Sequence, residues 1–260
     1  SGPEWSRHSL NLNQVDPRDL WETYLPAFKA LVQEADVRQV MCAYQRIDDD
    51  PCCANSRLLQ DILREDWGFK YVVVSDCGAV GDFYTSHKVS SDAMHAAAKA
   101  VLAGTDVECM WEGYTYKNLP EAVKKGLIKE EVIDSRLVRV LAARFELGEM
   151  DNEADVPWTK IPKSIVNNAH HRKLALDMAL QSMTLLQNKG NVLPLPKTTK
   201  KIAVIGPNAD NEPMLWGNYN GTPIRTITIL DGIKSKLPEK AIWYDKACDL
   251  VENKVTESYF

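Results

Sequence analysis

Tyr71-Val72-Val73-Val74-Ser75-Asp76 is a nearly continuous run of β-branched residues that ends on an acid. Such a run is typical of a strand that is buried on both faces of a parallel sheet. Asp76 then lies at the carboxyl end of the strand, where the βα loops of α/β folds gather and active sites are found. The plainer alternative is an aspartate that caps the following turn, and position alone does not choose between the two.

The residues before this strand predict a helix, a strand and a second helix. Asp16-Pro17 has the pattern of an N-cap followed by proline at the first helical position, and Pro26 is expected to kink or split that helix. A short apolar strand follows over 37–44, and residues 48–51 form an acidic loop. The second helix, capped by Asn55 or Ser56, is expected to stop at Gly68.

The residues after Asp76 continue the same alternation. A helix is predicted from about Asp92, a short strand over 105–109, and a long helix over about 129–147 that ends at Gly148. Strands that alternate with helices predict an α/β fold with right-handed parallel crossovers.

The helical and strand periodicity disappears between Asp151 and Pro162, as is typical of a linker. A helix over 164–187 is predicted next, and 201–206 and 241–244 are the first strands of a new parallel sheet. The sequence therefore predicts a first domain over 1–150, a linker over 151–163 and the start of a second domain over 164–260.

Composition excludes several classes of protein. The 260 residues are 45% hydrophobic, enough for a large core, and the net charge is −5 with basic residues scattered, so nucleic acid is not an expected partner. No apolar run is long enough to span a bilayer. No leader precedes Ser1, and both ends suggest a piece of a longer protein.

Six cysteines are present, without a CxxC pair or a histidine at metal spacing, so no metal site is expected. Most of them are predicted to be small buried packing residues. A disulfide among Cys42, Cys52, Cys53 and Cys77 is compatible with an exported protein, but the sequence leaves the pairing open.

The segment Val73-Val74-Ser75-Asp76-Cys77-Gly78-Ala79 resembles the nucleophile segment of glycoside hydrolase family 3. Many members have tryptophan where this chain has Cys77, and the Ser-Asp-Cys version resembles the β-xylosidase branch. Further segments resemble the same family in order and spacing, and they lie at 1–8, 40–45, 103–108, 185–188, 193–195, 205–209 and 216–223. The resemblance covers nearly the whole chain.

The resemblance implies a fold and an activity. The fold would be the C-terminal part of a (β/α)8 TIM barrel followed by the start of an α/β-sandwich domain. The activity would be that of an exo-acting retaining β-glycosidase that removes terminal β-D-xylose from xylo-oligosaccharides through a covalent intermediate. No cofactor is implied, the only implied partner is an oligosaccharide, and the implied location is secreted or periplasmic.

The resemblance also implies roles for particular residues. Asp76 would be the nucleophile, and the sugar would contact Tyr44, Met41, Cys77, Arg7 and Glu4. Four of these have plainer alternatives, since a tyrosine can end a strand with its ring in the core, a methionine in an apolar strand is more often core, and Glu4 and Arg7 could simply pair with each other.

The acid/base residue is implied to lie in the second domain, outside this chain, so the chain alone is expected to be inactive. His8, His87 and His95 have no catalytic spacing and are expected to be structural, and Asp106 is implied to shape the barrel floor. Three other interpretations stay open: a β-glucosidase, a non-catalytic glycan-binding relative, and a nucleotide-binding module. The last is weak because Gly206-Pro207-Asn208-Ala209 lacks the GxGxxG pattern.

Overall fold

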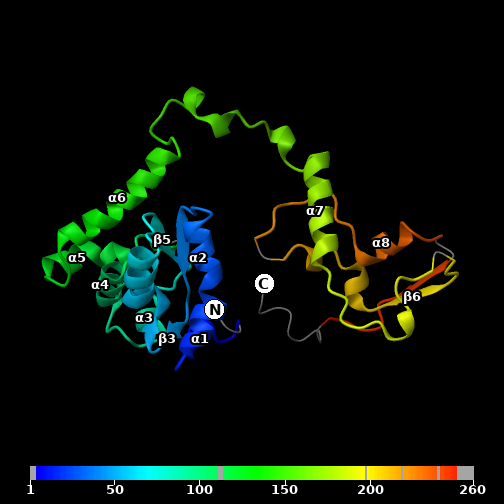
Figure 1. The fold of residues 1–260 in the computed structure, drawn as a ribbon, viewed down its shortest axis with the longest axis horizontal. Helices are drawn as coiled ribbons and strands as arrows, with labels where there is room; N and C mark the ends of the chain where they lie inside the picture. The colour runs from blue at the N-terminus through cyan, green and yellow to red at the C-terminus, as the bar shows by residue number, and fades with distance from the viewer. Residues whose placement is uncertain (1–3, 111–113, 197, 218, 239–240, 251–260) are drawn as a thin grey trace. The chain divides into compact units, whose positions relative to one another are not determined.

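The computed structural model describes residues 4–110, 114–196, 198–217, 219–238 and 241–250 (Figure 1). The chain divides into two compact units, Ser1–Lys160 and Ile161–Phe260. The first carries every residue to which the sequence assigns a site role. Ser1, Gly2, Pro3 and Asn218, which belong to segments that carry the family resemblance, lie outside the described residues.

Two parallel strands form the centre of the first unit. β2 (Gln39–Cys42) pairs with β5 (Val72–Ser75) from Gln39↔Val72 to Cys42↔Ser75. On the other side of β5, Val107 forms a single parallel bridge with Val74. The predicted strand at 71–76 is thus confirmed, whereas the predicted strand over 105–109 is reduced to a bridge.

The reason for this reduction is a side chain. The Val73 amide donates to Asp106 Oδ2 at 2.8 Å, so a carboxylate occupies the place of a ladder partner. The amides of Asp106 and Val107 both donate to the carbonyl of Val73, at 2.8 and 3.1 Å. A regular parallel ladder needs a backbone partner for every N–H and C=O group. Because the Val73 amide bonds a side chain instead, the ladder between β5 and residues 105–109 is reduced to a single bridge.

The three helices that alternate with β2, β5 and Val107 follow their expected boundaries closely. They are η3 (Arg57–Asp66), α4 (Ala93–Ala103) and α6 (Glu130–Glu146) (Figure 1). The Asp92 side chain caps α4 by accepting from the His95 amide at 2.9 Å. For η3 the capping bond comes from Asn55, whose Oδ1 accepts from the Leu58 amide at 3.0 Å. With β2, β5 and Val107 they complete the predicted alternation.

The N-terminal helical region is split, as its prolines predict. Asp16 accepts from the Arg18 amide and caps α1 (Pro17–Asp19), which continues into the π-helical η1 (Leu20–Tyr24). A separate helix, α2 (Pro26–Gln33), begins at Pro26 because proline has no N–H to donate but fits the first helical turn.

The acidic loop at 48–51 is in fact a small hairpin. β3 (Arg46–Ile47) pairs antiparallel with β4 (Asp50–Pro51), and Asp48 and Asp49 form the turn with positive φ. β1 (Asn11–Leu12) pairs with β3 on its other side. The remaining short elements of this unit are η2 (Cys52–Ala54), α3 (Asp82–Thr85), η4 (Thr115–Asn118), α5 (Leu119–Lys124), η5 (Glu153–Asp155) and η6 (Pro157–Lys160).

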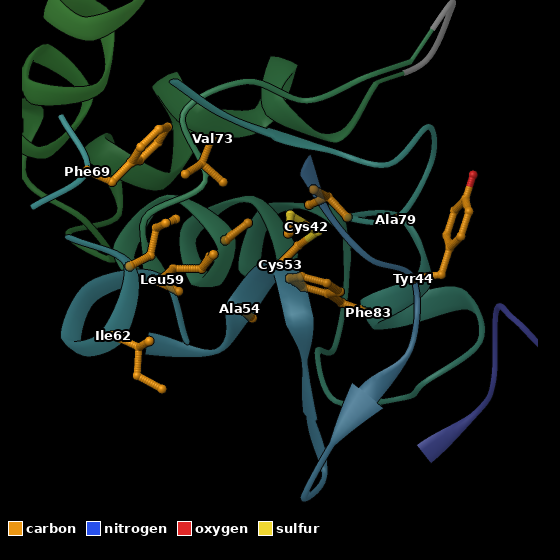
Figure 2. Packing of buried hydrophobic residues seen from close by; sticks show 14 of the residues in the cluster. Cys42, Tyr44, Cys53, Ala54, Leu59, Ile62, Phe69, Val73, Ala79 and Phe83 are labelled. Carbon is orange, nitrogen blue, oxygen red and sulfur yellow. A yellow bond between two sulfur atoms is a disulfide. The ribbon is translucent and has the colours of Figure 1, made fainter. Parts of the chain in front are cut away.

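The main hydrophobic core lies between η3, α4 and the β2–β5 pair. Figure 2 shows part of it, and the buried members include Cys42, Cys53, Leu59, Ile62, Phe69, Val73, Ala79 and Phe83. Within it a disulfide joins Cys42 to Cys53. A second disulfide joins Cys77 to Cys109. The prediction that most cysteines only pack is therefore wrong, and of the two that stay free Cys52 is buried and Cys248 is exposed.

An ionic cluster is buried near the start of β5, where Asp106 bonds the Val73 amide. The Asp106 side chain is completely buried and accepts from Arg64 at 2.7 Å and from Arg139 at 2.9 Å, while Arg136 lies 3.9 Å away. Burial lowers the pKa of both Arg64 and Arg136, partly offset by the charge of Asp106. The cluster ties η3 and α6 to β5.

The second unit contains a short parallel pair, β6 (Ile202–Ile205) with β7 (Ile242–Asp245), as the sequence predicts. α8 (Ile229–Lys234) begins with a capping box in which Thr228 and Asp231 bond each other's backbone amides. Its small core consists of Val204, Ala209 and Leu230 with partly buried neighbours. The remaining 3-10 turns are η7 (Lys163–Ile165), η8 (Lys189–Asn191), η9 (Pro207–Asp210) and η10 (Pro213–Leu215).

The helix predicted over 164–187 is wrong at both ends. α7 spans Ala169–Ser182, because the Asn168 side chain accepts from the His171 amide and starts the helix there, after η7. The linker boundaries over 151–163 stay a prediction. Among the described residues, no helix is long and apolar enough to cross a membrane. The described residues also contain no group of three or more His, Cys, Asp or Glu side chains that could hold a metal ion.

Candidate active site

Asp76 follows β5 directly and stands where the carboxyl ends of two parallel strands meet. Its amide donates to the Cys42 carbonyl, the last residue of β2, at 3.0 Å. One carboxylate oxygen, Oδ1, accepts from the Cys77 amide at 2.8 Å, so the side chain does cap its own turn. Because Asp76 is only half-buried, the cap does not hide the carboxylate and does not exclude a functional role, which stays a prediction.

Tyr44 lies beside Asp76, two residues beyond the end of β2. Its ring is 5% exposed and stands at the margin of the core cluster (Figure 2). Its hydroxyl donates to the Cys77 carbonyl at 2.7 Å. Burial, together with the charge of Asp76 and a side-chain hydrogen bond to it, raises the pKa of Tyr44 to about 12. The hydroxyl therefore keeps its proton throughout the neutral range and remains a hydrogen-bond donor.

Arg7 brings a positive charge to the same place. Its guanidinium lies 5.0 Å from the centroid of the Tyr44 ring, a cation–π distance. Arg7 Nη1 also pairs with Glu4 Oε1 at 3.1 Å, so the expected alternative of a pair between loop residues is observed. Glu4 itself is exposed. Arg7 therefore contacts the site residue Tyr44 directly, whereas Glu4 is connected to the site by its ion pair with Arg7.

The disulfide between Cys77 and Cys109 forms one border of the site. It links the residue after Asp76 to the segment beyond Val107, and two bonds support it: Gly78 N to Cys109 O at 2.9 Å, and Cys109 N to Ser75 Oγ at 3.0 Å. Cys77 therefore offers a disulfide surface and not a free thiol. The sequence did not single out Cys109, since it lies 32 residues away.

Met41 lies in β2 and is 56% exposed in this chain, so it does not belong to the core of the first unit. The neighbouring Cys42 points to the buried side, as the alternation of a strand requires.

The sequence missed a group of residues that surround Tyr44. His87 Nε2 lies 2.8 Å from the Tyr44 carbonyl, and the His8 ring centroid is 4.4 Å from that of Tyr44. His8 Nδ1 lies 2.7 Å from Asp82 Oδ2. No spacing signal could have found these residues, because 43 and 74 positions separate the hydrogen-bonded pairs.

His87 acts as a neutral donor in this group. Burial lowers its pKa, against the opposing effect of its bond to the Tyr44 carbonyl. A carbonyl only accepts, so Nε2 carries the proton. His87 thus fixes the backbone of Tyr44, while the hydroxyl bond to Cys77 fixes the other end of the side chain.

The site brings three chemical groups together. The partly accessible carboxylate of Asp76 accepts a backbone hydrogen bond, the protonated phenol of Tyr44 stands beside it, and the guanidinium of Arg7 lies over the Tyr44 ring. A carboxylate of this kind can act as a nucleophile or base toward a polar, hydroxyl-rich substrate, and the other two groups can hydrogen-bond such a substrate.

Two family models match the chain. The model of the glycosyl hydrolase family 3 N-terminal domain matches residues 4–143, and that of the family's C-terminal domain matches residues 183–258. The chain is 61% identical over its whole length to a xylan 1,4-beta-xylosidase of Xylanibacter ruminicola, and 35% identical over 92% of its length to the probable beta-D-xylosidase 7 of Arabidopsis thaliana. It spans 30% and 31% of these relatives' own lengths.

Solved structures agree with these matches. The GH3 exo-beta-xylosidase XlnD, in complex with a xylobiose aziridine activity-based probe, superposes with a TM-score of 0.83 at 32% identity, over 95% of this chain and 31% of that one. The beta-glucosidase of Listeria innocua in complex with glucose gives a TM-score of 0.77 at 28% identity, over 93% and 32% of the two chains. With one family model covering more than half of its residues, this α/β chain belongs to glycosyl hydrolase family 3.

Proposed function

We propose that the full-length protein carrying this chain is an exo-acting retaining β-glycosidase that hydrolyses terminal β-D-xylose from xylo-oligosaccharides. The observation that carries the proposal is the position of Asp76: a half-buried carboxylate at the end of β5, held by the Cys77 amide, beside the hydroxyl of Tyr44. The names of the relatives, two of them β-xylosidases, support the choice of sugar.

The proposed reaction has two displacements. The ionised Asp76 carboxylate attacks the anomeric carbon, and the bond to the leaving oxygen breaks as a second carboxyl group protonates that oxygen. Water then attacks the same carbon from the face that the leaving group occupied, giving its proton to the second group, and Asp76 is released. We assign the second group to a glutamate of the family's second domain and to no residue of this chain.

Tyr44 and Arg7 bind the sugar in this proposal. The Tyr44 hydroxyl, which donates to the Cys77 carbonyl in the structure, would redirect its proton to Asp76 or to the sugar 2-OH when the sugar binds, and the Arg7 guanidinium, held by Glu4, bonds further hydroxyls. The Cys77–Cys109 disulfide and Met41 are proposed to supply apolar contact surface at the border of the site.

We propose the same domain organisation that the sequence predicts. Residues 1–150 would be the C-terminal part of a (β/α)8 barrel, 151–163 a linker, and 164–260 the beginning of an α/β-sandwich domain. The parallel order of β2, β5 and Val107 with helices between them supports the first assignment, and the parallel β6–β7 pair supports the last.

An oxidising location, secreted or periplasmic, is proposed for the protein. Two disulfides in the first unit support it, because disulfides persist in such compartments and are rare in reducing ones.

Aryl β-xyloside and aryl β-glucoside, offered to the full-length protein at equal concentration, test the choice of sugar. We expect the larger kcat/KM with the xyloside. Faster turnover of the glucoside would favour the second candidate, a β-glucosidase, which the similarity to the Listeria innocua enzyme supports. Binding of both sugars without turnover of either would instead identify a non-catalytic glycan-binding relative.

Tyr44→Phe in the full-length protein should lower kcat/KM for the aryl xyloside by roughly 10- to 100-fold, the loss expected for a hydrogen bond to a charged group. The ring and its packing remain but the bond to the Cys77 carbonyl is lost, so the melting temperature should fall only slightly, as for one neutral hydrogen bond. Tyr24→Phe, at an exposed tyrosine in η1, is the matched control. A Tyr44→Phe enzyme as active as the wild type would remove Tyr44 from the proposed site.

A further inference from the structure

His8 stands between two partners that fix which of its nitrogens carries a proton. Arg7 Nε donates to His8 Nε2 at 3.1 Å, and a guanidinium N–H can only donate, so Nε2 is an unprotonated acceptor. On the other side, Nδ1 faces the Asp82 carboxylate at 2.7 Å, so Nδ1 bears the proton. The two contacts therefore assign the donor role to Nδ1 and the acceptor role to Nε2.

Asp82 is a firm anchor for this histidine. Its side chain is only 10% exposed, at the start of α3, and Oδ1 accepts from Ser86 Oγ at 3.0 Å while Oδ2 faces His8. The Asp82 carbonyl in turn accepts from the His87 amide at 2.7 Å. A rigid, buried acceptor of this kind fixes the plane of the His8 ring.

The fixed ring then determines the position of two groups of the proposed site. It contacts the Tyr44 ring in a tilted arrangement, with ring centroids 4.4 Å apart and an interplanar angle of 59°. His8 Nε2 accepts the hydrogen bond from Arg7 Nε–H, so the other N–H groups of the guanidinium remain for Glu4 and for a substrate.

We propose that His8 is a positioning residue of the glycosidase, anchored by Asp82, which orients Arg7 and Tyr44 around Asp76. The proposal rests on the proposed function of the same site. It extends that function by explaining why the sugar-binding guanidinium has one orientation.

Three substitutions in the full-length protein separate the contacts. His8→Gln can still accept from Arg7 through its amide oxygen, so it should keep KM within about threefold. His8→Asn can still bond Asp82 but does not reach Arg7, so it should raise KM for an aryl xyloside by roughly 10- to 100-fold, as for a lost hydrogen bond to a charged group. His8→Phe keeps a ring beside Tyr44 but cannot accept from Arg7, so it should resemble His8→Asn.

His95→Gln is the matched control, because His95 also pairs with an aspartate, Asp92, at 2.9 Å but on the exposed start of α4. It should not change KM. The proposal is overturned if His8→Phe has wild-type KM. It is equally overturned if all three His8 variants lose activity only in proportion to a lower melting temperature, since that is a purely structural role.

Calorimetric binding of xylose separates this failure from a failure of the proposed function. Wild-type protein that binds no xylose and cleaves no xyloside would refute the glycosidase itself. Wild type that binds xylose, with His8→Asn and His8→Phe binding it equally well, would refute only the positioning role. Binding weakened roughly 10-fold or more in those two variants, and kept in His8→Gln, is the expected result.

Discussion

Asp76→Ala in the full-length protein is expected to lower kcat for an aryl β-xyloside by roughly 10⁴- to 10⁶-fold, the loss found when the nucleophile of a covalent mechanism is removed. The carboxylate is only half-buried, so the truncation leaves no large cavity and should barely change the melting temperature. Steady-state kinetics with an activated leaving group, together with thermal unfolding, measures both effects.

Azide makes this test specific to the nucleophile. In the Asp76→Ala enzyme, azide can enter the vacated space and attack the anomeric carbon from the face that Asp76 used, so turnover should recover and release the inverted α-xylosyl azide. Asp134→Ala, at an exposed position of α6, is the control and should retain wild-type kinetics. A loss of less than about tenfold in Asp76→Ala would refute the assignment, because a covalent step cannot proceed without its nucleophile.

Asp106→Ala is expected to destabilise the first unit by about 3–5 kcal/mol, the cost of removing one partner of a buried ion pair. The Asp106 carboxylate is completely buried and is the acceptor for Arg64, for Arg139 and for the Val73 amide. Truncation would leave the guanidiniums in the interior without an anion to neutralise them. Urea unfolding of the full-length protein, followed through the transition that contains this unit, measures the loss.

Asp134→Ala again supplies the control, since exposed substitutions away from special features usually stay within about 0.5 kcal/mol. Asp106→Asn tests the charge separately from the shape, and it should also destabilise because an amide cannot neutralise Arg64 and Arg139. If Asp106→Ala unfolds within 1 kcal/mol of the wild type, the cluster does not hold β5 in place.

The order of elements in the first unit follows from local signals, which is why it could be predicted. Asp16-Pro17, Pro26, Asp92 and Gly148 set helix ends through capping bonds, a missing N–H or positive φ, all of which depend on one or two residues. The strand at 72–75 was equally predictable from its β-branched run. The start of the helix predicted over 164–187 was wrong because Ser164, Asn167 and Asn168 can each cap a helix, and the sequence does not show that Asn168 is the one that does so.

Asp76 itself was found from its place after a strand, and its segment carries the resemblance that named the family. The disulfide partner of Cys77 could not be found in that way. Cys109 lies beyond α4, and only the parallel alignment of Val74 with Val107 brings the two cysteines together.

The sequence by itself determined the α/β alternation, the family and the candidate nucleophile, because these depend on short segments whose chemistry is complete in place. Tertiary structure alone decided the surroundings of that nucleophile, with His8 against Tyr44 and Asp82 and His87 on the Tyr44 carbonyl, and it alone placed three arginines around Asp106 at the other end of β5. The physical reason is that hydrogen bonds and ion pairs act over a few ångströms, whereas the residues that form them here are separated by up to 74 positions. Only the packing of parallel strands and their helices brings such residues within that range.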